Sequence, residues 1–399
     1  MMPPRLRLLH VIASVGPVHG GPSLMVHEMA AGLVAAGHRA EVATTDDNGE
    51  RRLDVPLDGA LERDGVVYRH FERQWRAGTS SLPLARWLRG AAGSYDVLHV
   101  HGLFSHPTTA AARAAQRARV PYVVRPLGAL QPWGMAQGRR HLKRFLLRFV
   151  DGPLLAAAAA VHFTSAEERD QAAAAGVPGR PVVVPLGIRL PPTSSASGQS
   201  WLRVRHPDWT DRVIVLFLSR IHPKKGLDLL LPAFADVRAR HPRAALLLAG
   251  DGEPDYLRAL AGRAADLGVA RHVRFAGHLS GPDKQGAFAA ADLFVLPSRA
   301  ENFGVAAVEA LGAGCPVLVS TAVPLAAAVR EARAGWAAVP ERAQFTAALD
   351  RALATPAVER RAMGERGRAL AVARWSRDRM VADLVELYQR LATPRAGRT

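Results

Sequence analysis

The chain has 399 residues, of which 49% are hydrophobic, and a formal net charge of +17. This length suits two domains of ordinary size, and this hydrophobic content excludes wholesale disorder. The longest apolar run, 154–161, is too short to cross a bilayer, and the single cysteine, Cys315, excludes an intrachain disulfide and is expected to be a small core residue.

Strand-like runs alternate with Ala-rich helical segments along the chain, which is typical of parallel sheets with crossover helices. In the first half, the glycine loop Gly20-Gly21-Pro22 follows the first strand and precedes a helix. The strands predicted for this half are 6–14, 38–45, 96–101, 121–125, 160–164 and 181–185.

A polar stretch rich in Pro, Ser and Thr separates this half from a second alternating series. We therefore expect an α/β protein with two doubly wound, Rossmann-like domains that face a cleft. In such sheets ligands bind beyond the carboxyl ends of the strands. The predicted parts are a first domain over 1–190, a linker over 191–212, a second domain over 213–373 and a C-terminal helical segment over 374–399. The strands predicted for the second domain are 213–219, 244–250, 273–276, 292–297 and 316–320, and the last helix is predicted over 375–391.

Two glutamates eight residues apart, Glu301 and Glu309, lie in the most informative segment. A strand-like run, 291–297, leads to the first glutamate, Asn302 and Gly304 mark a turn, and the second glutamate lies in the helix that follows. The start of a helix presents backbone N–H groups and a dipole that bind anions. Backbone N–H groups that bind an anion, flanked by two carboxylates that bind hydroxyl groups, indicate a sugar nucleotide. An acid/base couple or two solvated residues are the alternatives.

A basic turn follows the first predicted strand of the second domain and contains Arg220 and Lys225. Lysine occurs only four times in this Arg-rich chain, and two lysines adjoin here, at Lys224 and Lys225. Two fixed cations would neutralise a diphosphate and stabilise the charge that grows as a nucleoside diphosphate departs. A solvated basic turn is the alternative, and the glutamate segment in the same domain favours the diphosphate.

Three features of the first domain are candidates for an acceptor site. Gly20 allows the backbone to approach a ligand closely. His99 and His101 are expected on opposite faces of their strand, which makes His101, at the strand end, the better contact, with a buried structural histidine as the alternative. Arg125 also ends a strand and could hold a phosphate or an acidic acceptor, or form a structural ion pair.

Residues 139–150 predict a basic amphipathic helix. Such a helix can rest on an anionic membrane or hold a lipid-linked acceptor. A domain helix with a solvated basic face is the commoner alternative and is favoured. One edge of the helix carries Arg140, Arg144 and Arg148, and its apolar face carries Leu142, Phe145, Leu146 and Phe149.

Two further patterns point away from other chemistries. Gly250-Asp251-Gly252 follows a strand but lacks a full dinucleotide-binding motif, so a tight turn is expected. Asp251, Glu253 and Asp255 have no accompanying His or carboxylate cluster at ligand spacing. We therefore expect no metal and no cofactor.

Together these motifs resemble the retaining glycosyltransferases of family 4, which have the GT-B fold. The resemblance covers essentially the whole chain in the right order. Its combination of Arg-Pro-Leu-Gly-x-Leu and Ser-Arg-Ile-x-Pro-Lys-Lys-Gly looks closest to bacterial polysaccharide-assembly members. It implies an acceptor-binding first domain, a nucleotide-sugar-binding second domain and a final helix that crosses back to the first. The motifs that carry it are the glycine loop, Asp-Val-Leu-His-Val-His-Gly, Arg-x-x-x-Lys-Lys-Gly, and Glu-x7-Glu followed by Ala-Leu-Gly-Ala-Gly-Cys-Pro-Val.

The resemblance also implies residue roles. Arg220 and Lys225 would bind the pyrophosphate, Glu301 would contact the hydroxyls of the donor sugar, and Glu309 would bind the ribose hydroxyls. Such enzymes need no catalytic metal, and retention would proceed by front-face attack, with the leaving phosphate accepting the proton of the acceptor. The other donor-side residues implied are Asn302, Phe303 and Gly304 beside the sugar, Gly21 near the diphosphate, and Gly277 and His278 in the segment that reads the base.

One departure from the family pattern concerns the acceptor. Many relatives carry a His in the strand-end segment that here reads Arg125-Pro-Leu-Gly, and this chain has Leu127 at that place. Whether His101 or Arg125 replaces it is left open.

The leading hypothesis is transfer of a hexosyl group from a UDP- or GDP-linked sugar to a saccharide or lipid-linked acceptor in surface polysaccharide biosynthesis. A nucleotide-sugar 2-epimerase of the same fold would need additional acid–base groups, and the Glu-Asn-Phe-Gly turn argues against it. A nucleic-acid-binding protein would cluster basic and aromatic residues, whereas aromatic residues are only 6% here. We expect a cytoplasmic protein, with peripheral contact on the inner face of the membrane as an open alternative.

Overall fold

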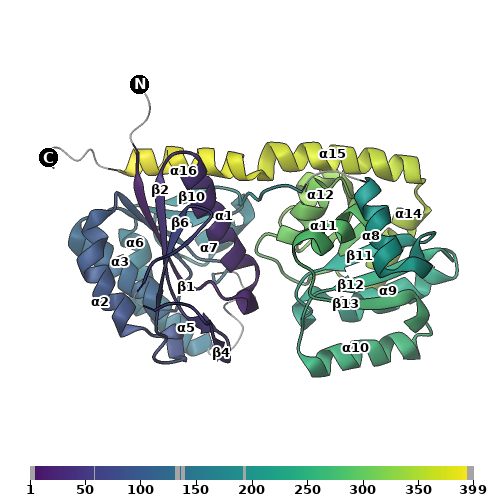
Figure 1. Ribbon diagram of the computed structural model, residues 1–399, viewed down its shortest axis with the longest axis horizontal. Helices are drawn as coiled ribbons and strands as arrows, with labels where there is room; N and C mark the ends of the chain where they lie inside the picture. The colour runs from purple at the N-terminus through teal and green to yellow at the C-terminus, as the bar shows by residue number, and fades with distance from the viewer. Residues whose placement is uncertain (1–4, 58, 131–134, 136–139, 192–194, 393–399) are drawn as a thin grey trace. The chain divides into compact units, whose positions relative to one another are not determined.

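The computed structural model describes residues 5–57, 59–130, 135, 140–191 and 195–392. The chain divides into two compact units, each built around its own sheet (Figure 1). The first unit comprises Met1–Gly187 and Arg377–Thr399, and the second comprises Ile188–Ser376. Both are α/β, which confirms the predicted fold class.

The first unit contains an eight-stranded sheet in the order β10-β9-β8-β7-β1-β2-β6-β5, parallel except for its antiparallel edge strand β5. A separate two-stranded pair is formed by β3 (Asp47–Asn48) and β4 (Arg51–Arg52). The strands of the main sheet are β1 (Arg7–Ser14), β2 (Arg39–Thr45), β5 (Leu61–Arg63), β6 (Val66–Phe71), β7 (Val97–His101), β8 (Tyr122–Arg125), β9 (Ala160–Phe163) and β10 (Pro181–Val183).

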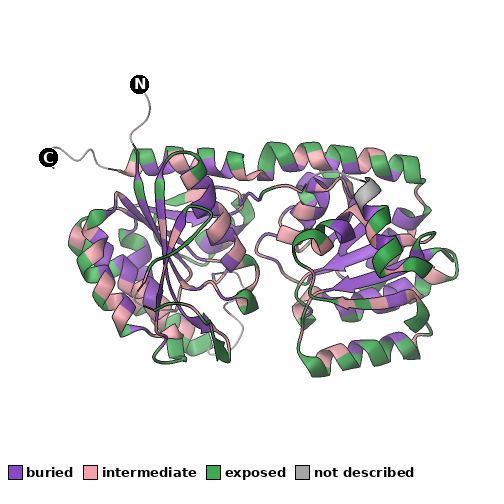
Figure 2. Cartoon of the chain, in the orientation of Figure 1, coloured by how far each residue is buried: buried purple, intermediate pink, exposed green. Residues whose placement is uncertain are grey.

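Helices cover both faces of this sheet, so its central strands are mostly buried (Figure 2). On one face, Leu9, Val11, Leu98 and Val100 join a hydrophobic core with the helices α2, α3 and α6. The opposite face carries the intervening side chains and meets α1 and α16. The helices are α1 (Gly21–Ala35), α2 (Leu82–Ala91), α3 (His106–Ala118), α5 (Arg140–Leu146), a π helix (Leu147–Asp151), α6 (Gly152–Ala157), α7 (Ala166–Ala174) and α16 (Arg377–Leu391).

The second unit contains a six-stranded sheet in the order β13-β12-β11-β14-β15-β16, and each described pairing within it is parallel. Its strands are β11 (Val213–Leu218), β12 (Ala244–Ala249), β13 (Val273–Gly277), β14 (Leu293–Leu296), β15 (Val317–Ser320) and β16 (Gly335–Ala338). Its helices are α8 (Ser195–Arg205), α9 (Leu227–Arg238), α10 (Pro254–Asp266), α11 (Gly281–Ala290), α12 (Val305–Gly312), α13 (Ala326–Glu331), α14 (Arg342–Ala354) and α15 (Ala357–Trp375).

The stretch predicted as a linker, 191–212, contains the helix α8 and belongs to the second unit. The indole of Trp201 packs against Gly286 of α11, where an added Cβ would lie 2.4 Å from the ring. Its N–H also donates to Asp283 at 2.9 Å. Partial burial of the indole ring, whose N–H has a hydrogen-bond partner, orders a stretch whose polar composition predicts a loop.

The helix predicted over 375–391 is α16, which begins two residues later, at Arg377. Ser376 has extended dihedral angles, φ −72° and ψ 149°, so α15 ends at Trp375 and α16 begins at Arg377. The helix α16 then packs on α1 in the first unit, where Gly32 lies against Val381. Among the described helices, none combines the length and apolar composition that a transmembrane span requires.

Candidate functional site

The donor-side residues of the second unit lie at or after the carboxyl ends of three strands, β13, β11 and β14, which are neighbours of one another or of β12 in the sheet. Gly277 ends β13 and accepts a hydrogen bond from the N–H of Gly250, which follows β12, at 2.7 Å. The N–H of Ile221, after β11, donates to the carbonyl oxygen of Asp251 at 2.7 Å. Gly250 has φ +140° and lies at a bend directly after β12. This is the edge at which parallel sheets bind ligands.

Two turns at this edge, 220–226 after β11 and 298–304 after β14, lie against each other. Gly226 has φ +74°, and a Cβ there would lie 2.2 Å from the carbonyl oxygen of Pro297. Across the contact, the N–H of Arg299 donates to the carbonyl oxygen of Lys224 at 2.9 Å, and its guanidinium binds Asp228 at 2.6 Å. Only glycine permits this close approach, which brings the basic turn to the glutamate turn.

Glu301 is nearly buried, with 9% of its surface exposed. Its Oε1 accepts a hydrogen bond from the hydroxyl of Ser298 at 2.8 Å and forms an ion pair with the ammonium of Lys225. The structure therefore brings the residue predicted for the donor sugar into direct contact with one predicted for the pyrophosphate. Each group offsets the desolvation cost of the other.

The basic turn concentrates positive charge. Burial lowers the pKa of His222, and the charges of Arg220, Lys224 and Lys225 lower it further. Burial is also the main cause of the lowered pKa of Lys224, whose ammonium is repelled by its two basic neighbours and attracted by Glu301. A polyanion would relieve this repulsion, as expected for a diphosphate site.

Glu309 lies in the second turn of α12, a helix that begins after Gly304 at φ +92°. Its Oε1 binds Nζ of Lys284, on α11, at 2.5 Å, and the two side chains are 13% and 26% exposed. Sequence reasoning missed Lys284, because the pair is 25 residues apart and α11 carries no motif. The rarity of lysine was the signal that could have indicated Lys284, since three of the four lysines in the chain lie in these segments of the second unit.

The other predicted donor-side residues differ in exposure. Asn302 is partly buried, whereas Phe303 is buried and meets Trp375 edge to face at 6.4 Å between ring centroids. His278 is exposed, and its Nδ1 lies 3.4 Å from Oδ2 of Asp251. Gly21 is the exposed first residue of α1 in the first unit.

His101 and Arg125, the acceptor-side candidates, face each other across β7 and β8 and are each only 1% exposed. Neither side chain therefore faces solvent, and the structural alternative applies to His101. The ring centroids of His99 and His101 are 4.2 Å apart, so the expectation that they lie on opposite faces is wrong. Side chains two residues apart on a strand share a face. Arg125 donates to the sulfur of Met29 at 3.4 Å.

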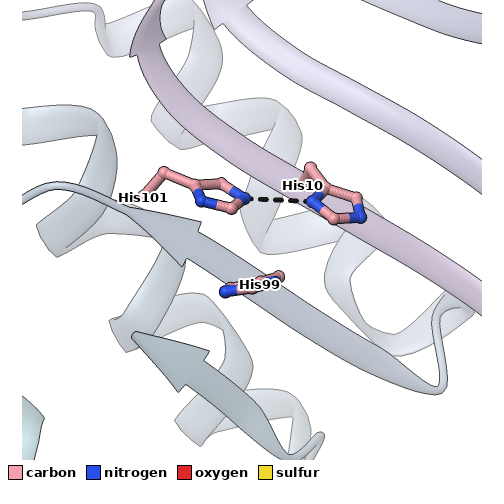
Figure 3. A group of neighbouring side chains, drawn as sticks. All are labelled: His10, His99 and His101. Carbon is pink, nitrogen blue, oxygen red and sulfur yellow. Dashed lines mark hydrogen bonds between the residues drawn. The ribbon is translucent and has the colours of Figure 1, made fainter. Parts of the chain in front are cut away.

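These residues form a buried polar cluster with His10, His162 and Tyr388. Nδ1 of His10 lies 3.0 Å from Nε2 of His101 (Figure 3). Nδ1 of His99 lies 2.6 Å from the hydroxyl of Tyr388, and its Nε2 lies 3.3 Å from Nδ1 of His162. The cluster thereby ties the C-terminal helix α16 to the middle of the first sheet.

A ring nitrogen from each of His10, His99 and His101 lies within 4.8 Å of the others, which is compatible with metal ligation. Sequence reasoning missed this grouping because it joins β1 and β7. Burial, the largest cause, lowers the pKa of all three rings, that of His10 to about 3, so the rings are neutral. However, His10 and His101 are engaged with each other, and the charge of Arg125 also depresses these pKa values, so it would repel a cation. We assign the cluster to the core.

Two positions near the strand ends of the first unit, Gly20 and Leu127, have positive φ and bear on the acceptor site. Gly20 has φ +65° directly before α1, a conformation that favours glycine. Leu127, where family members are expected to carry a His, has φ +58°, which is strained for a leucine. Backbone strain of this kind concentrates at functional sites, so the turn after β8 is the better acceptor candidate.

Comparison with known proteins identifies the family. The model of "Glycosyl transferase 4-like domain" matches residues 20–187, and that of "Glycosyl transferases group 1" matches residues 202–370. The chain is 30% identical over 364 residues to D-inositol 3-phosphate glycosyltransferase 2 of Catenulispora acidiphila, covering 84% of this chain and 83% of the relative. The chain belongs to the family 4 glycosyltransferases of GT-B fold.

This glycosyltransferase is also 29% identical over 364 residues to D-inositol 3-phosphate glycosyltransferase of Streptomyces avermitilis, covering 84% of this chain and 76% of the relative. Its fold matches that of Anabaena HepE, solved in complex with UDP-glucose, with a TM-score of 0.78 and 24% identity over 97% of this chain and 100% of HepE. The group 1 match, 202–370, spans both lysine–glutamate pairs. Cys315 of the glycosyltransferase is buried, and burial raises the pKa of its thiol, as expected of a core residue.

Proposed function

We propose that this glycosyltransferase moves a hexosyl group from a UDP- or GDP-linked sugar to a saccharide or lipid-linked saccharide, with retention of configuration and without a catalytic metal. The observation that carries the proposal is the contact of Lys225 with Glu301 at the carboxyl edge of the second sheet. The UDP-glucose complex of HepE, which has the same fold, supports a nucleotide-sugar donor. Surface polysaccharide biosynthesis and a cytoplasmic location belong to the same proposal.

In the proposed reaction, Arg220 and Lys225 bind the diphosphate, and Glu301 accepts hydrogen bonds from hydroxyls of the donor sugar. Backbone N–H groups at Asn302, Phe303 and Gly304, in the turn that leads into α12, complete the sugar side. Glu309 holds the ribose hydroxyls, and the exposed segment at Gly277 and His278 meets the base. A role for Gly21 in binding the diphosphate, which the family resemblance implies, belongs to the same proposal.

The bond from the anomeric carbon to the phosphate oxygen breaks as the acceptor hydroxyl attacks from the same face. The proton of that hydroxyl moves to the departing phosphate oxygen, so no side chain forms a covalent intermediate. Negative charge grows on the phosphate as the bond breaks, and the two cations stabilise it. Fixed groups of this kind typically contribute on the order of 10²–10³-fold in rate.

On the acceptor side, we place contact with the acceptor at Gly20 and the turn of Leu127. His101 and Arg125, being buried, position the ends of β7 and β8 from beneath.

Thermal denaturation with a panel of UDP- and GDP-linked hexoses tests the proposal. A true donor present at 100 times its Kd is expected to stabilise the protein by about 2.7 kcal/mol, which raises the Tm measurably. The same donor should then support transfer to a saccharide, and the anomeric configuration of the product, read by proton NMR, should equal that of the donor. A panel that leaves the Tm unchanged, with no release of UDP or GDP, would overturn the proposal.

Lys284→Ala is expected to raise the KM for the donor about tenfold, or about 1.4 kcal/mol, with little change in kcat. The reason is that the lysine orients the ribose-binding carboxylate of Glu309 and does not touch the reacting atoms. Lys284→Arg should recover part of the loss. Arg240→Ala, which removes a 3.0 Å ion pair with Asp350 in the same unit, is the control and should leave KM unchanged. Equal KM values in all four proteins would remove Lys284 from the site.

A further inference from the structure

We propose that α5 and the π helix after it, residues 140–151, bind the surface of an anionic lipid bilayer. Three large apolar side chains of this segment are exposed: Phe149 by 63%, Phe145 by 56% and Leu142 by 44%. The ring centroids of Phe145 and Phe149 are 4.9 Å apart, so the two rings form one patch. Contiguous exposed apolar surface on a soluble domain marks a binding surface.

Most of the core contact in this part of the chain is made by residues that follow the exposed patch. Leu154 and Leu155 are buried in the hydrophobic core of the first unit, and Leu147 packs against it. A helix whose only role is to cover the core needs no large apolar side chains besides those that face the core. The favoured sequence interpretation, a domain helix with a solvated basic face, therefore does not account for Phe145 and Phe149.

The π helix separates these two faces. The N–H of Gly152 donates to the carbonyl oxygen of Leu147, five residues earlier. A Cβ at Gly152 would lie 2.3 Å from that oxygen, so glycine permits the wide turn. A π turn holds one more residue than an α turn and changes the phase between α5 and α6. The apolar face of α5 is consequently out of line with the buried face of α6.

Cations border the exposed patch. The guanidinium of Arg148 lies 5.8 Å from the ring centroid of Phe149, and no Asp or Glu occurs between residues 140 and 150. Aromatic and aliphatic side chains flanked by cations suit a helix lying in the headgroup region of an anionic bilayer. A second copy of the chain on this face would bring like charges together, which disfavours a dimer. The bordering basic residues are Arg140, Lys143, Arg144 and Arg148.

The membrane contact does not rest on the proposed transfer reaction, because it uses none of the donor-side residues. Taken with that reaction, it places the acceptor-binding domain at the bilayer surface, where a lipid-linked saccharide is presented.

Co-sedimentation of the full chain with vesicles tests the inference. Vesicles of phosphatidylcholine with phosphatidylglycerol should bind the protein, and pure phosphatidylcholine should bind it far more weakly. The double variant Phe145→Ser/Phe149→Ser should weaken binding roughly tenfold or more. Arg144→Gln/Arg148→Gln should weaken it by about fivefold for each charge removed, and added salt should do the same.

Matched controls separate the contribution of this face to vesicle binding from that of positive charge in general and from any loss of folding. Arg86→Gln/Arg89→Gln removes two exposed arginines from α2 in the same unit and should change vesicle binding less than about twofold. The Phe145→Ser/Phe149→Ser variant should keep its far-UV circular dichroism and its transfer to a soluble saccharide. Equal binding to neutral vesicles, equal weakening by the α2 variant, or a dimer that the phenylalanine variant dissociates would overturn the inference.

Discussion

Lys225→Ala and Glu301→Ala are each expected to reduce kcat for transfer by on the order of 10²–10³-fold or more. Lys225→Ala removes the cation that stabilises the departing diphosphate, and Glu301→Ala removes the acceptor of the hydrogen bonds from the donor sugar. Steady-state transfer assays with the donor identified by thermal denaturation measure both. Activity within about threefold of the wild type in both variants would contradict the assignment of the site.

Stability must be separated from catalysis in these variants, because Lys225→Ala leaves a nearly buried carboxylate without its cation. Breaking a buried pair in this way typically costs about 3–5 kcal/mol. The double variant Lys225→Ala/Glu301→Gln removes both charges and should recover most of the lost stability, measured by urea unfolding. Its transfer activity should stay as low as that of Lys225→Ala. Recovery of activity together with stability would mean that the pair serves the fold alone.

Acidification is expected to unfold the first unit over an unusually steep range between about pH 6.5 and pH 3. Burial lowers the pKa of His10 and His162 from 6.5 to about 3, and those of His99 and His101 well below 6.5. Below pH 6.5 the unfolded chain therefore binds protons that the folded unit does not. Stability is fully present above pH 6.5 and falls as the pH falls, by about 1.4 kcal/mol per pH unit for each histidine.

Urea unfolding at pH 7.5, 6 and 5, followed by circular dichroism, measures this slope. His10→Gln removes one buried titrating ring and should reduce the slope by about 1.4 kcal/mol per pH unit. His278→Gln, at a 65% exposed side chain, is the matched control and should leave the slope unchanged. Identical slopes in the wild type and in His10→Gln would show that the cluster does not govern acid stability.

The local motifs were predictable from the sequence, because the residues that define them are neighbours in the chain. Alternating strands and helices indicated two α/β domains, and the turn around Gly226 indicated the basic site. Contacts made through the fold were not predictable. Lys284 of α11 meets Glu309 of α12 only in the folded chain, and the histidine cluster depends on the register between β1 and β7.

Burial also depended on tertiary packing that no local pattern shows. The sequence predicts an amphipathic helix over 139–150, but Leu154 and Leu155 of the next helix satisfy the core and leave Phe145 exposed. Likewise, Trp201 orders α8 only because Gly286 provides a flat surface for its ring.

The most direct test of the proposed donor site is calorimetric titration with the nucleoside diphosphate and with the corresponding nucleotide sugar. Wild type, Glu301→Gln and Glu309→Gln are compared, since the amide keeps the shape of each carboxyl group. If Glu301 holds the sugar and Glu309 the ribose, Glu301→Gln will weaken binding of the nucleotide sugar but not of the nucleoside diphosphate. Glu309→Gln will weaken binding of both ligands. An equal loss of affinity for both ligands in Glu301→Gln, or unchanged affinities in Glu309→Gln, would contradict the assignment.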